Sequence, residues 1–361
     1  MPTDPMSEAN DGVALMSPDL LSGQESLPGD LCLKIHRLMV RTRCLEERII
    51  KMSKSGQGHF WIGGPGEEAF NACLGLRVKK GQGPDYDYLH LHYRKSATHV
   101  AMGMPLIESI RQMAMRATDT HSLGRNFSGH FSKSAWNVLP VSSVIEVQYS
   151  MAPGTALMQK RLSDDSLTIV TGGDAGTAEG DFASCMIWST LPDREVPVLM
   201  IVTNNGYGIS TSSCSVHSES RIIDRGKAFG IPGEVVDGND PIASWHAIGR
   251  AMNYVRTTRR PYMLEALVSR LYGHSSSSGA LRVKSDLDCI DLLERKLLAK
   301  GLLDRPALAQ IREEALAEVE EAVEQALAEP DPRVEDIEKF TYAPSDVDAV
   351  YPGDYTGLPS S

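Results

Sequence analysis

The chain has 361 residues, of which 42% are hydrophobic and 23% are charged, and its formal net charge at pH 7 is −11. This composition fits a globular protein with a large core, and the acidic balance argues against a general nucleic-acid binder, because phosphate attracts basic surfaces. No apolar run approaches the roughly 20 residues that a membrane helix needs.

The N-terminal segment, residues 1–28, is rich in Pro, Ser, Asp and Gly, and it predicts a mobile arm. Its first residues resemble neither a secretory signal nor an Arg-rich transit peptide. The six cysteines are scattered without a Cys-x-x-Cys pair, which indicates reduced thiols rather than disulfides or a zinc site. We therefore expect a cytoplasmic protein.

Helical spacing of apolar residues predicts the first helix over 31–52. An irregular segment follows, which contains Phe60, Trp61 and a Gly-Gly-Pro-Gly turn. Two more helices are expected, over 67–78 and 105–115. The next stretch has little periodicity and is expected to be a long loop over 118–147; such loops are often functional.

Short apolar or β-branched runs alternate with helical patterns in the second half of the chain. Strands are predicted over 167–171, 196–203, 234–237 and 262–268, with helices over 181–191 and 242–255. This alternation predicts an α/β fold in three layers, in which helices flank a parallel sheet.

The expected organisation has three parts. The α/β domain covers 29–300, the arm precedes it, and a C-terminal helix and tail occupy 301–361. The helix is marked by apolar residues from Leu316 to Leu327 and ends at Pro330.

Two polar segments directly follow predicted strands. One reads TGGDAGTAEGD over 171–181, and the other reads TNNGYG over 203–208. Because ligands bind at the carboxyl ends of parallel strands, both segments should lie at one edge of the sheet. Asp174 and Asn205 offer the oxygen ligands that Mg²⁺ prefers. The glycines near Asp174 and the helix beginning near Gly180 would admit a phosphate.

Each segment has a simpler interpretation when it is considered alone. Gly-rich turns are common after strands in α/β folds, and Asn-Gly is a standard turn signal. The pair is more specific than either part, because one predicted helix separates two buried strands. The pair therefore predicts a diphosphate bridged to Mg²⁺.

Asp174 and Asn205 are 31 positions apart. This pair resembles the thiamine diphosphate motif, in which Asn-Asn follows Gly-Asp-Gly at a similar spacing. From about Leu31 to Pro330, the chain is similar to α subunits of the decarboxylating component of branched-chain 2-oxo acid and pyruvate dehydrogenase complexes. The resemblance implies the diphosphate-binding half of the thiamine diphosphate fold. It also implies Asp174, Asn205 and the Tyr207 carbonyl as metal ligands, with the backbone of Ala175 and Gly176 at the diphosphate.

Other stretches resemble the same family, including Gly66-Glu-Glu-Ala, His92-Tyr-Arg, 124–130, 142–148 and 237–240. The resemblance implies that Tyr93 and Arg94 contact the diphosphate, that Ser143 contacts the cofactor and that Ile145 lines the substrate pocket. Arg suits this role because its guanidinium grips phosphate bidentately. Without the resemblance, Tyr93-Arg94 alone would indicate a solvated helix start.

A Ser-rich loop over 272–280 contains His274. Such loops are usually linkers, and most histidines pack or face solvent, but the resemblance implies an active-site histidine here, where an imidazole can exchange protons near neutral pH. Ser275 occupies a position that is phosphorylated in animal relatives. A phosphate there would repel an anionic cofactor, and the sequence leaves such regulation open.

The chain departs from the family pattern at several positions. Ala175 adds a methyl group where the family usually has Gly. Val147 replaces a Thr of the family's potassium site, which argues against that ion. The Ser-rich loop lacks the usual Asp pair, and Arg282 is the candidate for its basic residue. An extra loop over 192–195 lengthens the gap between the two motif halves.

The resemblance implies oxidative decarboxylation of a small branched-chain 2-oxo acid of the 3-methyl-2-oxobutanoate type, with acyl transfer to a lipoyl domain of the acyltransferase component. A β subunit would supply the pyrimidine-binding domain and its Glu, so an α2β2 heterotetramer is expected. The C-terminal helix and tail are candidates for that contact, and Phe60 and Trp61 are candidates for the substrate side.

Other functions are weighed against this one. A pyruvate or acetoin-type substrate fits the same resemblance. A nicotinamide dehydrogenase would carry Gly-x-Gly-x-x-Gly after its first strand, and no such fingerprint is found. A non-catalytic relative is suggested by Ala175, although Tyr93, Arg94 and His274 argue against it.

Overall fold

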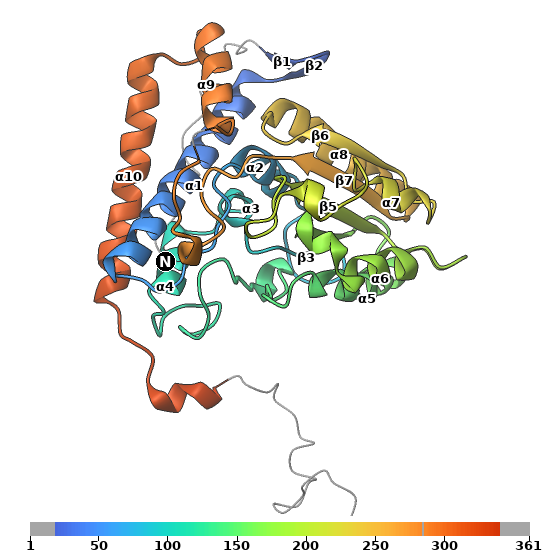
Figure 1. Ribbon diagram of the computed structural model, residues 1–361, viewed down its shortest axis with the longest axis horizontal. Coiled ribbons are helices and arrows are strands. Elements are labelled where there is room, and N and C mark those ends of the chain that lie inside the picture. Colours follow the sequence, from blue (N-terminus) through green and yellow to red (C-terminus); the bar gives the residue numbers. More distant parts are fainter. Residues whose placement is uncertain (1–18, 284, 340–361) are drawn as a thin grey trace, which may run out of the picture.

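The computed structural model describes residues 19–283 and 285–339, and it has a five-stranded parallel sheet between layers of helices (Figure 1). The strands in order across the sheet are β3 (Tyr88–His90), β4 (Thr168–Gly173), β5 (Val198–Asn204), β7 (Tyr262–Leu267) and β6 (Gly233–Asp237). The predicted α/β class and all four predicted strands are confirmed. β3 was not predicted, because three residues are too few to show a period.

The side chains of β5 explain the layers. Val198, Met200 and Val202 join a core with helices α5 (Val147–Leu162) and α6 (Gly180–Ser189). Leu199 and Ile201 point to the opposite core, which contains α2 (Glu68–Arg77) and α8 (Pro241–Thr258). Successive side chains alternate between faces, so this unbroken apolar run reflects burial on both faces of the sheet.

The C-terminal helix lies on the outside of the helical layer (Figure 1). α10 (Arg305–Ala328) packs along α1 (Gly29–Ser55) and α4 (Leu106–Met113), and the Arg41–Glu318 ion pair of 2.6 Å joins it to α1. Most of its apolar stripe is covered within the chain, whereas Leu316 is 41% exposed, and the helix stays a candidate for the subunit contact. The expected tail lies outside the described residues from 340 onward.

The remaining elements are short. They are α3 (Ser96–Ala101), α7 (Asp224–Lys227), α9 (Cys289–Ala299) and the 3-10 turns η1 (Ser134–Trp136), η2 (Ala175–Ala178), η3 (Ser213–Ser215), η4 (Ser276–Ser278) and η5 (Val334–Glu338). Residues 118–146 are otherwise irregular, as the sequence predicts. α5 was missed, because Pro153 and Gly154 inside it disfavour a helix.

Part of the predicted N-terminal arm is ordered. β1 (Leu20–Ser22) and β2 (Glu25–Leu27) form an antiparallel hairpin, and Leu20 and Leu27 are buried. The ring Nε2 of His246 on α8 bonds to the Ser26 carbonyl at 2.7 Å. The prediction of a mobile arm is therefore wrong for these residues, while residues 1–18 lie outside the described part.

The register of the sheet brings the expected site segments to one edge. Gly173 at the end of β4 pairs with Thr203 of β5, and Thr203 pairs with Ala266 of β7. The loops that follow β3, β4, β5 and β7 therefore leave the sheet side by side. All six cysteines are free, and five of them are buried. Within the described ranges, no helix has the length and apolarity to cross a membrane.

Candidate active site

A cavity of about 460 Å³ opens at this edge of the sheet. All ten residues predicted for the site line it, namely Tyr93, Arg94, Ser143, Ile145, Asp174, Ala175, Gly176, Asn205, Tyr207 and His274. Eight of them come from the four loops that follow β3, β4, β5 and β7, and Ser143 and Ile145 come from the loop before α5. Their roles toward a cofactor stay predictions, but their meeting at one cavity is a feature of the fold.

Tyr93 and Arg94 are buried, with 7% and 5% of their surface exposed, so they do not form a solvated helix start. They lie in the turn between β3 and α3. Arg94 donates a 3.0 Å hydrogen bond to Nδ1 of His274 and also bonds the Gly63 carbonyl. Burial, with Arg94 and Arg270 nearby, lowers the pKa of His274 to about 4. The His274 ring is therefore neutral at pH 7, beside a fixed guanidinium.

Asp174 has the features of a metal ligand. Its side chain is 1% exposed, and Oδ2 has no hydrogen-bond partner among the described residues. A buried carboxylate oxygen without a partner is costly. Burial raises the pKa of Asp174 to about 6. A divalent cation would satisfy this oxygen and favour the charged carboxylate, so the residue fits the predicted role.

The second half of the motif forms a turn at the end of β5. The backbone N–H of Tyr207 donates to Oδ1 of Asn205 at 3.1 Å, and Gly206 has a φ of 77°. Asn205 can form this turn and still bind a metal ion, because its amide oxygen has a second lone pair. Within the described residues, no group of three or more His, Cys, Asp or Glu side chains is suited to a metal. A metal here would use oxygens from Asp174, Asn205 and the backbone.

The extra methyl group of Ala175 lies opposite Gly208. A Cβ built on Gly208 would lie 3.3 Å from the Cβ of Ala175. The loop after β5 therefore leaves room for this methyl group. The guanidinium of Arg270 donates to the Gly208 carbonyl at 2.6 Å and lies over the Tyr207 ring. Arg270 was not predicted for the site, although it follows the same strand as His274.

The loop over 118–147 supplies one wall of the cavity. Ser143 bonds Nε2 of His130, whose ring stacks parallel to Tyr93 with centroids 6.3 Å apart. Phe60 and Phe127 also line the cavity and pack edge to face. This wall is apolar and aromatic, as in many small-molecule sites.

Trp61 does not reach the cavity, so its predicted place on the substrate side is wrong. Its side chain is 1% exposed, and its indole N–H donates to Oε2 of Glu46 at 2.7 Å. Burial raises the pKa of Glu46. Trp61 thus joins the α1 layer to the segment that carries Phe60.

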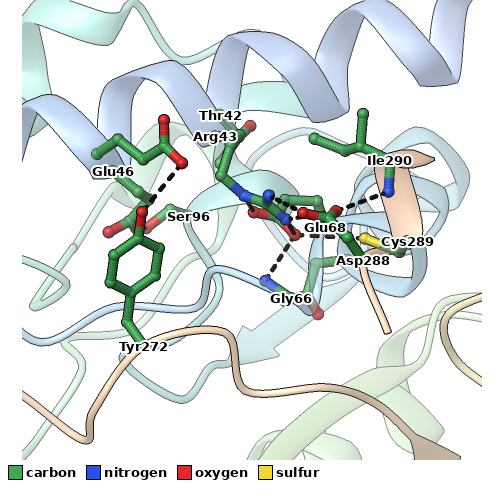
Figure 2. A network of polar contacts seen from close by, with 12 residues as sticks. Thr42, Arg43, Glu46, Gly66, Glu68, Ser96, Tyr272, Asp288, Cys289 and Ile290 are labelled. Carbon is green, nitrogen blue, oxygen red and sulfur yellow. Dashed lines mark hydrogen bonds and ion pairs between the residues drawn. The ribbon is translucent and has the colours of Figure 1, made fainter. Parts of the chain in front are cut away.

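A buried ionic network contacts the turn that ends at Gly66 (Figure 2). Arg43 of α1 binds both Glu68 and Asp288, at 2.6 and 2.7 Å. Glu68 accepts the Gly66 N–H at 2.7 Å, and Asp288 accepts from Arg282 at 2.8 Å. This arrangement ties the Gly-Gly-Pro-Gly turn to the end of the His274 loop. Arg282, the candidate for the basic residue of that loop, therefore belongs to this network.

Two buried acids near the cavity were not singled out from the sequence. Glu67 pairs with Lys95 at 2.9 Å, and both side chains are at most 2% exposed. Glu146 is 1% exposed, and burial raises its pKa to about 8. Glu67 lies within a quoted motif, which was a usable signal. Glu146 lies within the quoted stretch 142–148, but its contact with the Gly173 N–H joins two distant segments, which no local pattern shows.

Comparison with known proteins identifies the group to which the chain is similar. 2-Oxoisovalerate dehydrogenase subunit alpha of Bacillus subtilis (strain 168) is 27% identical over 317 residues, which is 86% of this chain and 94% of that protein. Pyruvate dehydrogenase E1 component subunit alpha of the same organism is 28% identical, over 88% of this chain and 83% of that protein.

The mitochondrial 2-oxoisovalerate dehydrogenase subunit alpha 2 of Arabidopsis thaliana is 29% identical over 256 residues. The aligned part is 71% of this chain and 52% of that protein. Residues 36–335 match the family described as dehydrogenase E1 component. This match covers most of the chain and confirms the predicted resemblance. The chain belongs to the dehydrogenase E1 component family.

Proposed function

We propose that this chain is the α subunit of a 2-oxo acid dehydrogenase that binds thiamine diphosphate through Mg²⁺ and acts on a branched-chain 2-oxo acid. The family supports the general reaction and the cofactor. The observation that carries the proposal is the unpartnered, buried Oδ2 of Asp174 at the same cavity as Arg94 and His274. A metal-bound anion needs a free carboxylate oxygen for the cation and a positively charged side chain for the anion.

The cavity residues would divide the work of holding the cofactor. Asp174, Asn205 and the Tyr207 carbonyl would bind Mg²⁺, and the backbone N–H groups of Ala175 and Gly176 would face the diphosphate. Arg94 would pair with phosphate oxygens as a fixed cation. When bound, thiamine diphosphate supplies the electron sink for decarboxylation.

His274 has a defined proton position. Because a guanidinium is only a donor, Nδ1 of His274 accepts, and a neutral ring then carries its proton on Nε2. His274 would therefore donate a hydrogen bond to an oxygen in the cavity. Ser143, which bonds His130, would hold the wall on which the cofactor rests.

The branched-chain preference is supported by the lining of the cavity. Its large aliphatic and phenyl side chains are Phe60, Ile62, Phe127, Ile145 and Ile209. Such a wall favours an isopropyl group over a methyl group, since each buried methylene contributes about 0.8 kcal/mol. The pyruvate-type relative has a similar identity, so the choice depends on this chemistry.

An exposed apolar face supports a β partner. α5 and α6 lie side by side (Figure 1), and both begin at the cavity, directly after Glu146 and Glu179. They expose large apolar side chains, namely Met151, Leu157, Leu162, Ile187 and Trp188. Such surfaces mark protein interfaces. We propose that the β subunit of an α2β2 assembly covers this face and completes the site, and that a lipoyl domain receives the acyl group.

The test is decarboxylation by the chain co-purified with its β subunit, with thiamine diphosphate and Mg²⁺. The proposal predicts a higher kcat/KM with 3-methyl-2-oxobutanoate than with pyruvate, and formation of acyl-lipoyl product on a lipoyl domain. Equal or greater kcat/KM with pyruvate would overturn the branched-chain assignment. Absence of turnover with both acids would overturn the enzyme assignment.

A further inference from the structure

Glu146 has an unusual backbone and a buried side chain. It directly precedes α5 and has a φ of 62°, a left-handed conformation that few residues other than glycine adopt. Its side chain is 1% exposed. The left-handed backbone and the burial of an ionisable side chain each cost free energy, so the contacts of Glu146 must offset both costs.

The carboxyl group of Glu146 clamps the end of β4. Oε1 accepts the backbone N–H of Gly173 at 3.2 Å, immediately before Asp174. Oε2 accepts from the side-chain amide of Gln148 at 3.3 Å, and that amide also donates to the Thr171 carbonyl at 3.0 Å. Glu146 and Gln148, at the start of α5, thus bind the Gly173 N–H and the Thr171 carbonyl, on either side of Gly172.

Glycines on the strand and turn leave space for this carboxyl group. A Cβ built on Gly172 or on Gly176 would overlap the carboxyl group of Glu146, whereas a Cβ on Gly154 would meet no atom within 4 Å. The side chain of Glu146 therefore occupies the volume that side chains at 172 and 176 would need. The acid and the two glycines form one packing unit, although they come from different elements.

We propose that Glu146 is a positioning residue for the cofactor. It holds the Gly173–Gly176 turn so that the Asp174 carboxylate and the N–H groups of Ala175 and Gly176 face the cavity. This inference rests on the proposed function, because the turn is positioned for a metal-bound diphosphate. Glu146, which also lines the cavity, acts on the cofactor through this turn.

The test is a double-mutant cycle in the complex with the β subunit. Glu146→Ala, Gly176→Ala and the double variant are compared by calorimetric titration with thiamine diphosphate and Mg²⁺. Glu146→Ala is expected to weaken binding about tenfold, the effect of one lost hydrogen bond. Gly176→Ala is expected to have a similar effect, because its methyl group would displace the Glu146 carboxyl group from the Gly173 N–H. The loss of affinity in the double variant is expected to be smaller than the product of the two single losses. The methyl group at position 176 then occupies the volume that the Glu146 side chain has left.

Two variants separate positioning from mere stability. Glu146→Gln keeps an oxygen for the Gly173 N–H and is expected to restore cofactor affinity to near the wild-type value. Glu313→Ala removes an exposed carboxylate on α10, outside the cavity lining, and is expected to leave the affinity unchanged. The melting temperature of the cofactor-free complex is recorded for every variant.

The inference would be overturned if the double variant lost affinity by the full product of the two single losses. It would also be overturned if Glu146→Ala lowered the melting temperature but bound the cofactor with wild-type affinity. Either result, obtained with a wild-type complex that binds, leaves the proposed function intact. A wild-type complex that does not bind thiamine diphosphate would overturn both.

Discussion

Arg94 and His274, 180 positions apart in the sequence, are joined by a 3.0 Å hydrogen bond between Nη2 of the guanidinium and Nδ1 of the ring. The contact links the loop after β3 to the loop after β7 across two intervening strands. It fixes the tautomer of His274, because Arg94 can only donate. It also places a permanent positive charge at the cavity where an anionic cofactor would bind.

Replacing Arg94 tests this pairing. Arg94→Gln is expected to weaken thiamine diphosphate binding by about 10- to 100-fold, the range for hydrogen bonds to charged groups. Arg94→Lys should recover only part of the loss, because Lys lacks the bidentate fork. Calorimetric titration of the complex measures both. Arg295→Gln, at an exposed arginine on α9, is the control. Equal affinities in all variants would contradict the role of Arg94.

The buried Glu67–Lys95 pair is expected to stabilise the base of the site. Glu67→Gln leaves the Lys95 ammonium buried without its counter-charge, which typically costs about 3–5 kcal/mol. Lys95→Met in the same chain should recover much of this loss. The urea unfolding midpoint is the measurement. Asp165→Asn breaks the exposed Lys79–Asp165 pair of 2.7 Å and should cost less than about 1 kcal/mol. Equal shifts for the buried and exposed pairs would be evidence against this ranking.

Two buried histidines predict how stability depends on pH. Burial lowers the pKa of His90 to about 4 and that of His99 to about 3. The unfolded chain, in which histidine titrates near pH 6.5, therefore binds more protons than the folded chain below that pH. The contribution of these two histidines to the free energy of unfolding is complete above about pH 6.5 and is expected to fall as the pH drops toward 4.

Urea unfolding at pH 7 and pH 5 measures this slope. His90→Gln, which can keep the 2.9 Å contact with Thr155, is expected to reduce it. His59→Gln, at an exposed position, is expected to leave it unchanged. An identical slope in a His90→Gln, His99→Gln double variant would show that other groups cause the dependence.

The neighbouring aromatics Phe60 and Trp61 are expected to behave differently. Trp61→Phe removes the 2.7 Å bond to the buried carboxyl group of Glu46 and should destabilise the chain by about 1–3 kcal/mol without changing KM. Phe60→Ala removes a wall of the cavity and should raise KM for a branched-chain substrate. Steady-state kinetics and melting curves compare the two. A raised KM in Trp61→Phe would return Trp61 to the substrate side.

Much of the site followed from the sequence because strand order constrains it. Asp174 and Asn205 each come after a buried apolar run, and parallel pairing of those runs is enough to bring the two residues together. The resemblance to a known family then supplied Tyr93, Arg94 and His274, which carry little local signal. The structure places all of them at the same cavity.

The missed features depend on contacts between distant segments. Glu146 meets Gly173 only because α5 begins where β4 ends, and Trp61 turns inward because Glu46 offers a buried acceptor. The hairpin over 20–27 is too short for a visible period, and its order comes from packing on α8. In each case tertiary packing overrides local pattern.

The most direct test of the central claim is a titration of the complex with thiamine diphosphate, with and without Mg²⁺, for wild type and Asp174→Ala. The account predicts binding that requires Mg²⁺ in the wild type and is lost in the variant. Binding of the same strength in Asp174→Ala, or in the wild type after removal of divalent cations, would contradict it.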